Sequence, residues 1–151
     1  MLTRSSEGYS IMDQHVPGHD WISIVRQNGT AEFGKAFAPH PTLDASVLNG
    51  PCVGVEAIAA FFAATSGGMY ETIEFTHETT TGRKTYLEWR GKAFGKHVGG
   101  TTILTRNNEG LIENIQLYHS PLPVVVEFSR ELAKRLQGKV DQALLIEEPD
   151  P

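Results

Sequence analysis

A stretch in the middle of the chain decides the fold: residues 72–90 read TIEFTHETTTGRKTYLEWR. Apolar and polar residues alternate in both halves of this stretch, and a period of two is typical of strands with one buried face. Thr81-Gly82-Arg83 separates the halves and has the composition of a hairpin turn. We therefore predict an antiparallel pair of strands. The residues expected on its buried face are Ile73, Phe75, His77, Leu87 and Trp89.

The strand pattern continues towards the C-terminus. Residues 98–106 and 111–119 form two more expected strands, joined by the turn Asn107-Asn108-Glu109-Gly110. An apolar stripe with helical spacing then predicts a helix from about residue 123 to 137.

The first third of the chain is expected to be mainly helical. Residues 21–25 predict a short helix, and residues 31–38 predict a second one that ends before Pro39. A strand is expected over 42–48, and the clearest helix of the chain lies between Gly54 and Gly67. Helices followed by consecutive antiparallel strands indicate an α+β domain, with a curved sheet that carries its helices on the concave face.

The composition is that of one globular domain. The chain has 151 residues and a net charge of -5, from 13 Lys and Arg against 18 Asp and Glu. No basic stripe is present to neutralise a run of phosphates, so a nucleic-acid partner is not expected. The single Cys52 excludes an internal disulfide and favours the cytoplasm, and no apolar stretch reaches the ~20 residues that cross a bilayer. We expect residues 1–18 to be a flexible arm, 19–138 the domain and 139–151 an acidic tail.

Two stretches carry a resemblance to a known family. The first runs from Trp21 to Ile58 and includes Gly54-Val55-Glu56-Ala57-Ile58 at a helix start; the second is Leu104-Thr105-Arg106-Asn107, followed by Gly110. With the order of elements over residues 19–120, they resemble the NTF2-like superfamily, which includes ketosteroid isomerases, SnoaL-like cyclases and scytalone dehydratase. The resemblance implies a cone-shaped α+β fold and a homodimer formed through the outer sheet face. The whole chain looks like an uncharacterised bacterial branch of the superfamily.

The resemblance does not extend to the catalytic residues of the ketosteroid isomerases. Those enzymes use a Tyr and a protonated Asp as hydrogen-bond donors and a second Asp as the base. On the ungapped register these positions hold Trp21, Thr102 and Ala45, and an alanine cannot accept a proton. We therefore expect that the chain is not a ketosteroid isomerase. Asp44 is left as either a base at the cavity mouth or a surface residue.

The same register predicts a pocket that contains two histidines. His119 stands where the isomerases have an aromatic residue that lines the cavity, and strand alternation places His77 on the same concave face. Histidine moves protons near neutral pH without a cofactor, so we take His119 and His77 as the catalytic candidates. The residues expected to line the pocket and bind substrate are Trp21, Trp89, Thr102, Leu87, Phe75, Phe61 and Leu117.

Two functions remain open. The first is a cofactor-free isomerase, cyclase, dehydratase or lyase that acts on a small apolar or aromatic molecule, with Thr102 donating a hydrogen bond to a substrate oxygen. The second is a non-catalytic ligand-binding or interaction module, in which both histidines are simply packed in the core. The other histidines (His15, His19, His40 and His97) are expected at the surface, and no metal site or cofactor is predicted. Glu88 and Arg90 are expected on a charged outer face or in a dimer contact.

Overall fold

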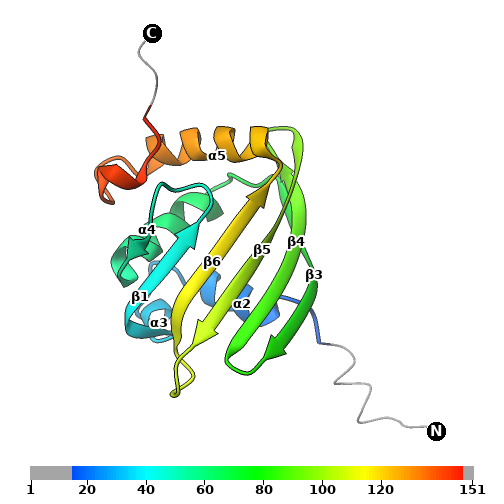
Figure 1. Cartoon of the computed structure of the whole chain (residues 1–151), viewed down its shortest axis with the longest axis vertical. Coiled ribbons are helices and arrows are strands. Elements are labelled where there is room, and N and C mark those ends of the chain that lie inside the picture. Colours follow the sequence, from blue (N-terminus) through cyan, green and yellow to red (C-terminus); the bar gives the residue numbers. More distant parts are fainter. Residues whose placement is uncertain (1–14, 148–151) are drawn as a thin grey trace, which may run out of the picture.

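Residues 15–147 of the chain are described by the computed structural model, and a six-stranded sheet forms their centre. The strand order is β2-β1-β6-β5-β4-β3; β1 runs parallel to β6, and the other neighbours are antiparallel (Figure 1). The strands are β1 (Phe37–Ala45), β2 (Cys52–Val53), β3 (Thr72–Thr81), β4 (Lys84–Ala93), β5 (Lys96–Arg106) and β6 (Ile112–Ser120). The predicted hairpins are confirmed, and the sheet is mixed and open.

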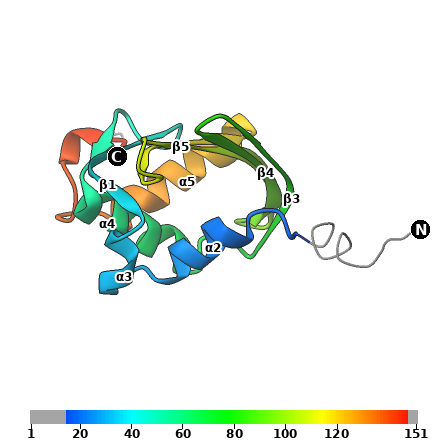
Figure 2. The same ribbon diagram turned by 90° about the horizontal axis from the view of Figure 1, so that it is seen from below.

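The helices lie on one face of this sheet, which curves around them (Figure 2). They are α2 (His19–Arg26), α3 (Ala31–Gly34), α4 (Val55–Ser66) and α5 (Leu122–Arg135), with a single 3-10 turn η1 (Gln142–Leu144) after α5. The α+β class with helices on the concave face is therefore confirmed. None of the helices in residues 15–147 has both the length and the hydropathy needed to cross a membrane.

The second short helix and the first strand differ from the prediction. Helix α3 ends at Gly34 rather than near residue 38, and β1 begins at Phe37 rather than at Thr42. Proline is normally excluded from central strand positions because it lacks the backbone N–H that donates to the neighbouring strand. Here the pairing of β1 with β6 is interrupted between Phe37 and Thr42, so the stretch that holds both prolines does not need that donor. The alternation of apolar and polar residues in the sequence does not by itself show such an interruption.

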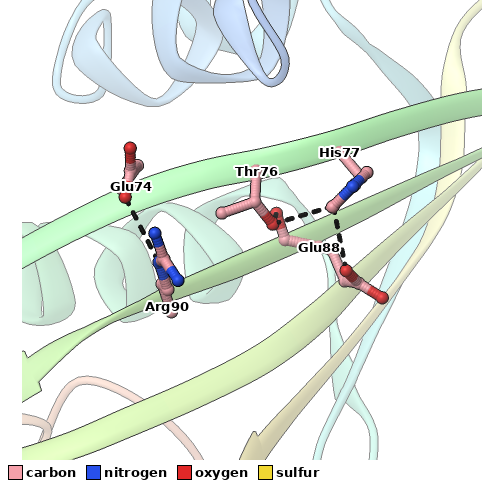
Figure 3. Close-up of polar contacts among 5 residues, drawn as sticks. All are labelled: Glu74, Thr76, His77, Glu88 and Arg90. Atoms are coloured by element: carbon pink, nitrogen blue, oxygen red, sulfur yellow. Dashed lines mark hydrogen bonds and ion pairs between the residues drawn. The ribbon is translucent and has the colours of Figure 1, made fainter.

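A β-bulge in β3 overturns the predicted orientation of His77. Phe75 pairs with Trp89 and His77 pairs with Glu88, so Thr76 is an extra residue without a partner in β4. One extra residue inverts the alternation for the rest of the strand. The side chain of His77 is 75% exposed on the convex face, where Nδ1 lies 3.1 Å from Glu88 Oε1 and 3.1 Å from Thr76 Oγ1. The prediction that His77 faces the pocket is therefore wrong. In Figure 3 its ring points towards Glu88, beside the Arg90–Glu74 ion pair.

The bulge also turns Glu78 to the concave side. Glu78 Oε1 accepts a hydrogen bond of 2.8 Å from the backbone N–H of Gly18, the residue just before α2. Gly18 has φ +76°, and a Cβ at this position would lie 2.5 Å from the Phe75 ring. Glycine therefore allows the chain to pass directly over β3, and Glu78 fixes the start of α2 there.

The part of the predicted C-terminal tail that the structure describes lies against the domain. Leu145 is 5% exposed, and Asn49 Nδ2 donates a hydrogen bond to its carbonyl oxygen at 3.0 Å. Residues 1–14 of the predicted arm (1–18) and residues 148–151 of the predicted tail lie outside the described part of the chain.

Three strands place Trp89, Gly100 and His119 in one row across the concave face. Gly100 pairs with Trp89 on one side and with His119 on the other. Because Gly100 has no side chain, the indole of Trp89 reaches across it, and the Trp89 and His119 rings come within 5.0 Å between centroids. A Cβ on Gly100 would lie 2.4 Å from Trp89 Cζ2 and 2.1 Å from the carbonyl oxygen of Tyr118. The position therefore requires glycine.

We expect Gly100→Ala to lower the free energy of unfolding by about 3 kcal/mol, because the new methyl group must displace both an indole and a backbone carbonyl. Gly99→Ala is the matched control: its Cβ meets only the carbonyl oxygen of Trp89, at the ordinary distance of 3.6 Å. Urea unfolding of the two variants measures the difference. Equal stabilities would show that the Trp89 indole does not depend on the space above Gly100.

Candidate functional site

A cavity of about 390 Å³ opens between α2, the end of α4 and the concave face of the sheet. Its walls are mainly apolar, and its polar lining residues include Tyr70, Thr102 and the charged Arg26. We call it the main cavity. Its lining residues are Trp21, Ile22, Val25, Arg26, Phe62, Thr65, Ser66, Tyr70, Ile73, Phe75, Trp89, Thr102 and Leu117.

Five of the seven residues predicted to line the pocket do so; they are Trp21, Trp89, Thr102, Phe75 and Leu117. The other two lie elsewhere. Phe61 is completely buried in the core, edge-on to Phe62 with the ring centroids 5.1 Å apart. Leu87 faces a second cavity of about 320 Å³, nearer the hairpin between β3 and β4, and Trp21 borders both cavities. The second cavity is more polar, since Glu78 and Arg106 also line it.

His119 faces the concave side, as predicted, but it is not among the residues that line the main cavity. It is 6% exposed and lies behind Tyr70, with Nε2 only 2.6 Å from the Tyr70 hydroxyl oxygen. Its backbone N–H donates to Ser46 Oγ at 2.9 Å, which fixes the end of β6. Among the residues that the structure describes, no group is within hydrogen-bond distance of the buried Nδ1.

Aromatic rings surround the imidazole of His119. The Phe128 ring lies 4.6 Å away between centroids, Trp89 packs edge-on, and the Tyr70 ring is nearly parallel at 7°. Burial in these surroundings lowers the pKa of His119 to about 4 and raises the pKa of the Tyr70 phenol well above its ordinary value. The pair is therefore uncharged at neutral pH.

Tyr70 is the site residue that sequence reasoning missed. It stands in the short connection between α4 and β3, where neither the helical nor the strand period applies. The only signal in the sequence is its place two residues after the helix stop at Gly67-Gly68, where the chain turns back over the sheet.

Thr102 is another hydroxyl-bearing residue that lines the main cavity. It is 2% exposed, and its Oγ1 accepts a hydrogen bond of 3.1 Å from Trp89 Nε1. The indole N–H can only donate, so Thr102 Oγ1 is the acceptor in this hydrogen bond. The hydroxyl hydrogen of Thr102 can then be donated to another group. This arrangement suits the predicted role of Thr102 as a donor to a ligand oxygen.

Asp44 faces the convex side of the sheet, where it accepts a hydrogen bond of 3.0 Å from Asn114 Nδ2. Of its two predicted alternatives, the structure favours the surface residue. Glu88 and Arg90 lie on the same outer face, as expected. Within residues 15–147, no three His, Cys, Asp or Glu side chains are grouped so that they could hold a metal ion.

Comparison with known proteins identifies the fold. No family model matches the sequence, and no curated protein matches it. A steroid delta-isomerase from Pseudomonas aeruginosa has a similar structure, with a TM-score of 0.70 and 13% identity over 80% of this chain and 88% of that chain. An uncharacterized protein with a cystatin-like fold from Silicibacter pomeroyi gives 0.68 and 17% over 76% and 80%. An NTF-2 like protein of unknown function from Burkholderia xenovorans gives 0.52 and 15% over 68% and 81%. The chain therefore has the NTF2-like fold that its sequence resembles, and identities this low show the fold alone.

The buried imidazole predicts a pH dependence of stability. A histidine in the unfolded chain takes up a proton near pH 6.5, whereas burial keeps folded His119 neutral down to about pH 4. The unfolded state then binds one more proton between these values. Stability is therefore highest above pH 6.5 and falls as the pH is lowered, by up to about 1.4 kcal/mol per pH unit.

Chemical denaturation of the wild type and of His119→Gln between pH 7 and pH 4.5 measures this effect. We expect the difference in unfolding free energy between the two proteins to shift in favour of the variant as the pH falls. Parallel pH curves would show that folding does not lower the pKa of His119.

Proposed function

We propose that the protein uses the main cavity of its NTF2-like fold to bind one small, mostly apolar molecule. The observation that supports this most is the combination of size and lining: about 390 Å³, mainly apolar walls, and a few polar residues that include Tyr70, Thr102 and Arg26. Ligand pockets in proteins have this volume range and this mixture of many apolar and few polar groups.

As an enzyme, the protein would carry out cofactor-free proton transfer: isomerisation, cyclisation, dehydration or lysis. Tyr70, rather than His119, is the group placed to meet the substrate, because Tyr70 lines the cavity and His119 lies behind it. Hydroxyl donors in a cavity shielded from water stabilise an oxygen that gains negative charge during such reactions. A steroid delta-isomerase shares the fold. Since Ala45 stands where the ketosteroid isomerases have their catalytic base on the sequence register, we do not assign ketosteroid isomerisation to this chain.

The second candidate is a binding module without turnover. The neutral state of His119 and its tight aromatic packing favour it, because a base with a pKa of about 4 is weak at neutral pH. Both candidates bind the same class of ligand, and detection of product separates them.

We also propose that the protein is a homodimer formed through the convex face of the sheet. No helix of the described chain covers this face (Figure 2), and Tyr86 and Tyr118 are 41% and 42% exposed on it. The face also carries both signs of charge, as in the pairs Arg90–Glu74 and His77–Glu88. A surface with apolar groups and both charges can be complementary to a second copy of itself across a two-fold axis.

Ligand binding is tested with the tryptophans themselves. Trp21 and Trp89 are the two tryptophans of the chain and both line the main cavity, so their fluorescence reports on its occupant. We expect acetophenone or a similar small neutral aromatic compound to change this fluorescence saturably. Val25→Phe, which places a larger side chain into the cavity, should weaken binding about tenfold.

Val53→Phe is the matched control, because Val53 is 61% exposed on β2 and does not line the main cavity. It should bind as the wild type does. Equal weakening by both variants, or no saturable change with any such compound, would contradict the proposed cavity.

The dimer is tested by light scattering after gel filtration. Tyr86→Lys/Tyr118→Lys should convert the dimer to a monomer, because four like charges would then meet across the two-fold axis. Val53→Lys, on β2 at the edge of the sheet, should leave the dimer intact. A wild-type protein that is monomeric at micromolar concentration would contradict the proposal.

A further inference from the structure

We infer that the main cavity takes an organic acid with an apolar body: the body lies inside the cavity, and a carboxylate at its mouth is held by the guanidinium of Arg26. This inference names the ligand class of the proposed function and rests on that function. Arg26 is then the residue that selects the charge of the ligand.

Of the described residues that line the main cavity, Arg26 alone is charged. The other polar lining residues carry neutral hydroxyl groups, and the Tyr70–His119 pair at the wall is uncharged at neutral pH. A guanidinium keeps its positive charge at every pH at which proteins are studied in the folded state. The cavity therefore combines apolar walls with one fixed positive charge, which favours an anion over a cation.

The acidic side chains on the neighbouring elements are directed elsewhere. Asp20, on the same helix as Arg26, lines the second cavity and stands six residues earlier, which is about 9 Å along the helix axis. Glu78 also lines the second cavity, and Glu74 pairs with Arg90 on the convex face. Within residues 15–147, Arg26 takes part in none of the ion pairs. Its charge is therefore available to a ligand.

Two helices, α2 and α4, end at this cavity, and the C-terminal end of a helix carries a negative partial charge. The carbonyl groups there already accept hydrogen bonds. Arg135 Nη1 donates to the carbonyl oxygens of Ala64 and Gly67 at 3.0 and 2.8 Å, and the backbone N–H groups of Gln27 and Asn28 donate to the last turn of α2. An anion at the mouth therefore meets the guanidinium without facing bare carbonyl groups.

The exposure of the lining residues sets the direction of the ligand. Trp89, Thr102 and Leu117 form the deep part of the cavity and are 3%, 2% and 5% exposed, whereas Arg26 and Ser66 are exposed. A ligand with its apolar body at the deep end buries that body and keeps its carboxylate in contact with water. This direction avoids the large desolvation cost of a carboxylate inside the cavity.

A carboxylate suits this mouth better than a phosphate does. The two oxygens of a carboxylate match the fork of a guanidinium, which can donate two parallel hydrogen bonds to them. One arginine balances the single charge of a carboxylate. A phosphate monoester carries nearly two negative charges at neutral pH, and among the described lining residues there is no second cation for the other charge.

The ligand class is tested with two probes of nearly equal shape, cinnamate and cinnamamide, which are anionic and neutral at pH 7. Isothermal titration calorimetry measures their affinities. Wild-type protein should bind cinnamate about fivefold more tightly, the upper value for an ion pair in contact with water. Arg26→Gln should remove this preference and leave the affinity for cinnamamide unchanged, which also shows that the variant is folded.

Arg130→Gln is the matched control, because it changes the net charge by the same amount from α5, outside the main cavity. It should keep the preference for cinnamate. Arg26→Lys should keep part of it, since the positive charge remains without the fork. Loss of the preference in both glutamine variants would show a long-range effect of net charge and overturn the inference.

The remaining outcomes separate the inference from the proposed function. If the wild type binds both probes equally, or if Arg26→Gln prefers cinnamate as strongly as Arg26→Lys does, the inference is wrong and the cavity remains a binding site for apolar molecules. If neither probe binds and acetophenone also fails to bind, the proposed function and the inference are both wrong.

Discussion

The contact of the Trp89 indole across Gly100 is the constraint on which the interior of the cone depends. It occupies the centre of the concave face, and its N–H fixes the Thr102 hydroxyl at 3.1 Å. Its ring also closes one side of the box of aromatic rings around His119. The Thr102 hydroxyl is therefore positioned by one side chain that needs a glycine beside it. Strand register, more than any local preference, brings these residues together.

Much of the architecture follows from patterns that depend only on local chemistry. The hairpin around Gly82, the helix between Gly54 and Gly67, and the inward direction of Leu87 and Trp89 are all read from spacing and turn residues. These features are predictable because burial of alternate residues leaves a regular trace in the sequence. Trp21, Thr102 and His119 are placed instead by the register of the family resemblance, and of these Trp21 and Thr102 line the main cavity.

The differences arise where a single residue breaks a pattern. The extra Thr76 inverts the alternation of β3, and nothing in the types of the neighbouring residues marks it, because threonine is at ease on either face of a strand. Tyr70 belongs to a connection that has no period at all. Because Tyr70 lines the main cavity and His119 lies behind it, His119 is a buried hydrogen-bond partner of the Tyr70 phenol and not the expected base in contact with substrate. Which polar groups meet depends on long-range packing, so it becomes visible only in three dimensions.

The bulge at Thr76 lies in β3, at one edge of the sheet, and it determines which side chains lie on both faces there. The insertion that sends His77 outwards also sends Glu78 inwards, to the N–H that begins the helix carrying Trp21. One inserted residue thus shapes the outer charge pattern and anchors the wall between the two cavities. Evolution of the outer surface in this region is therefore not independent of evolution of the interior: a chain without the insertion would place the imidazole of His77 on the concave face and the carboxylate of Glu78 on the convex face.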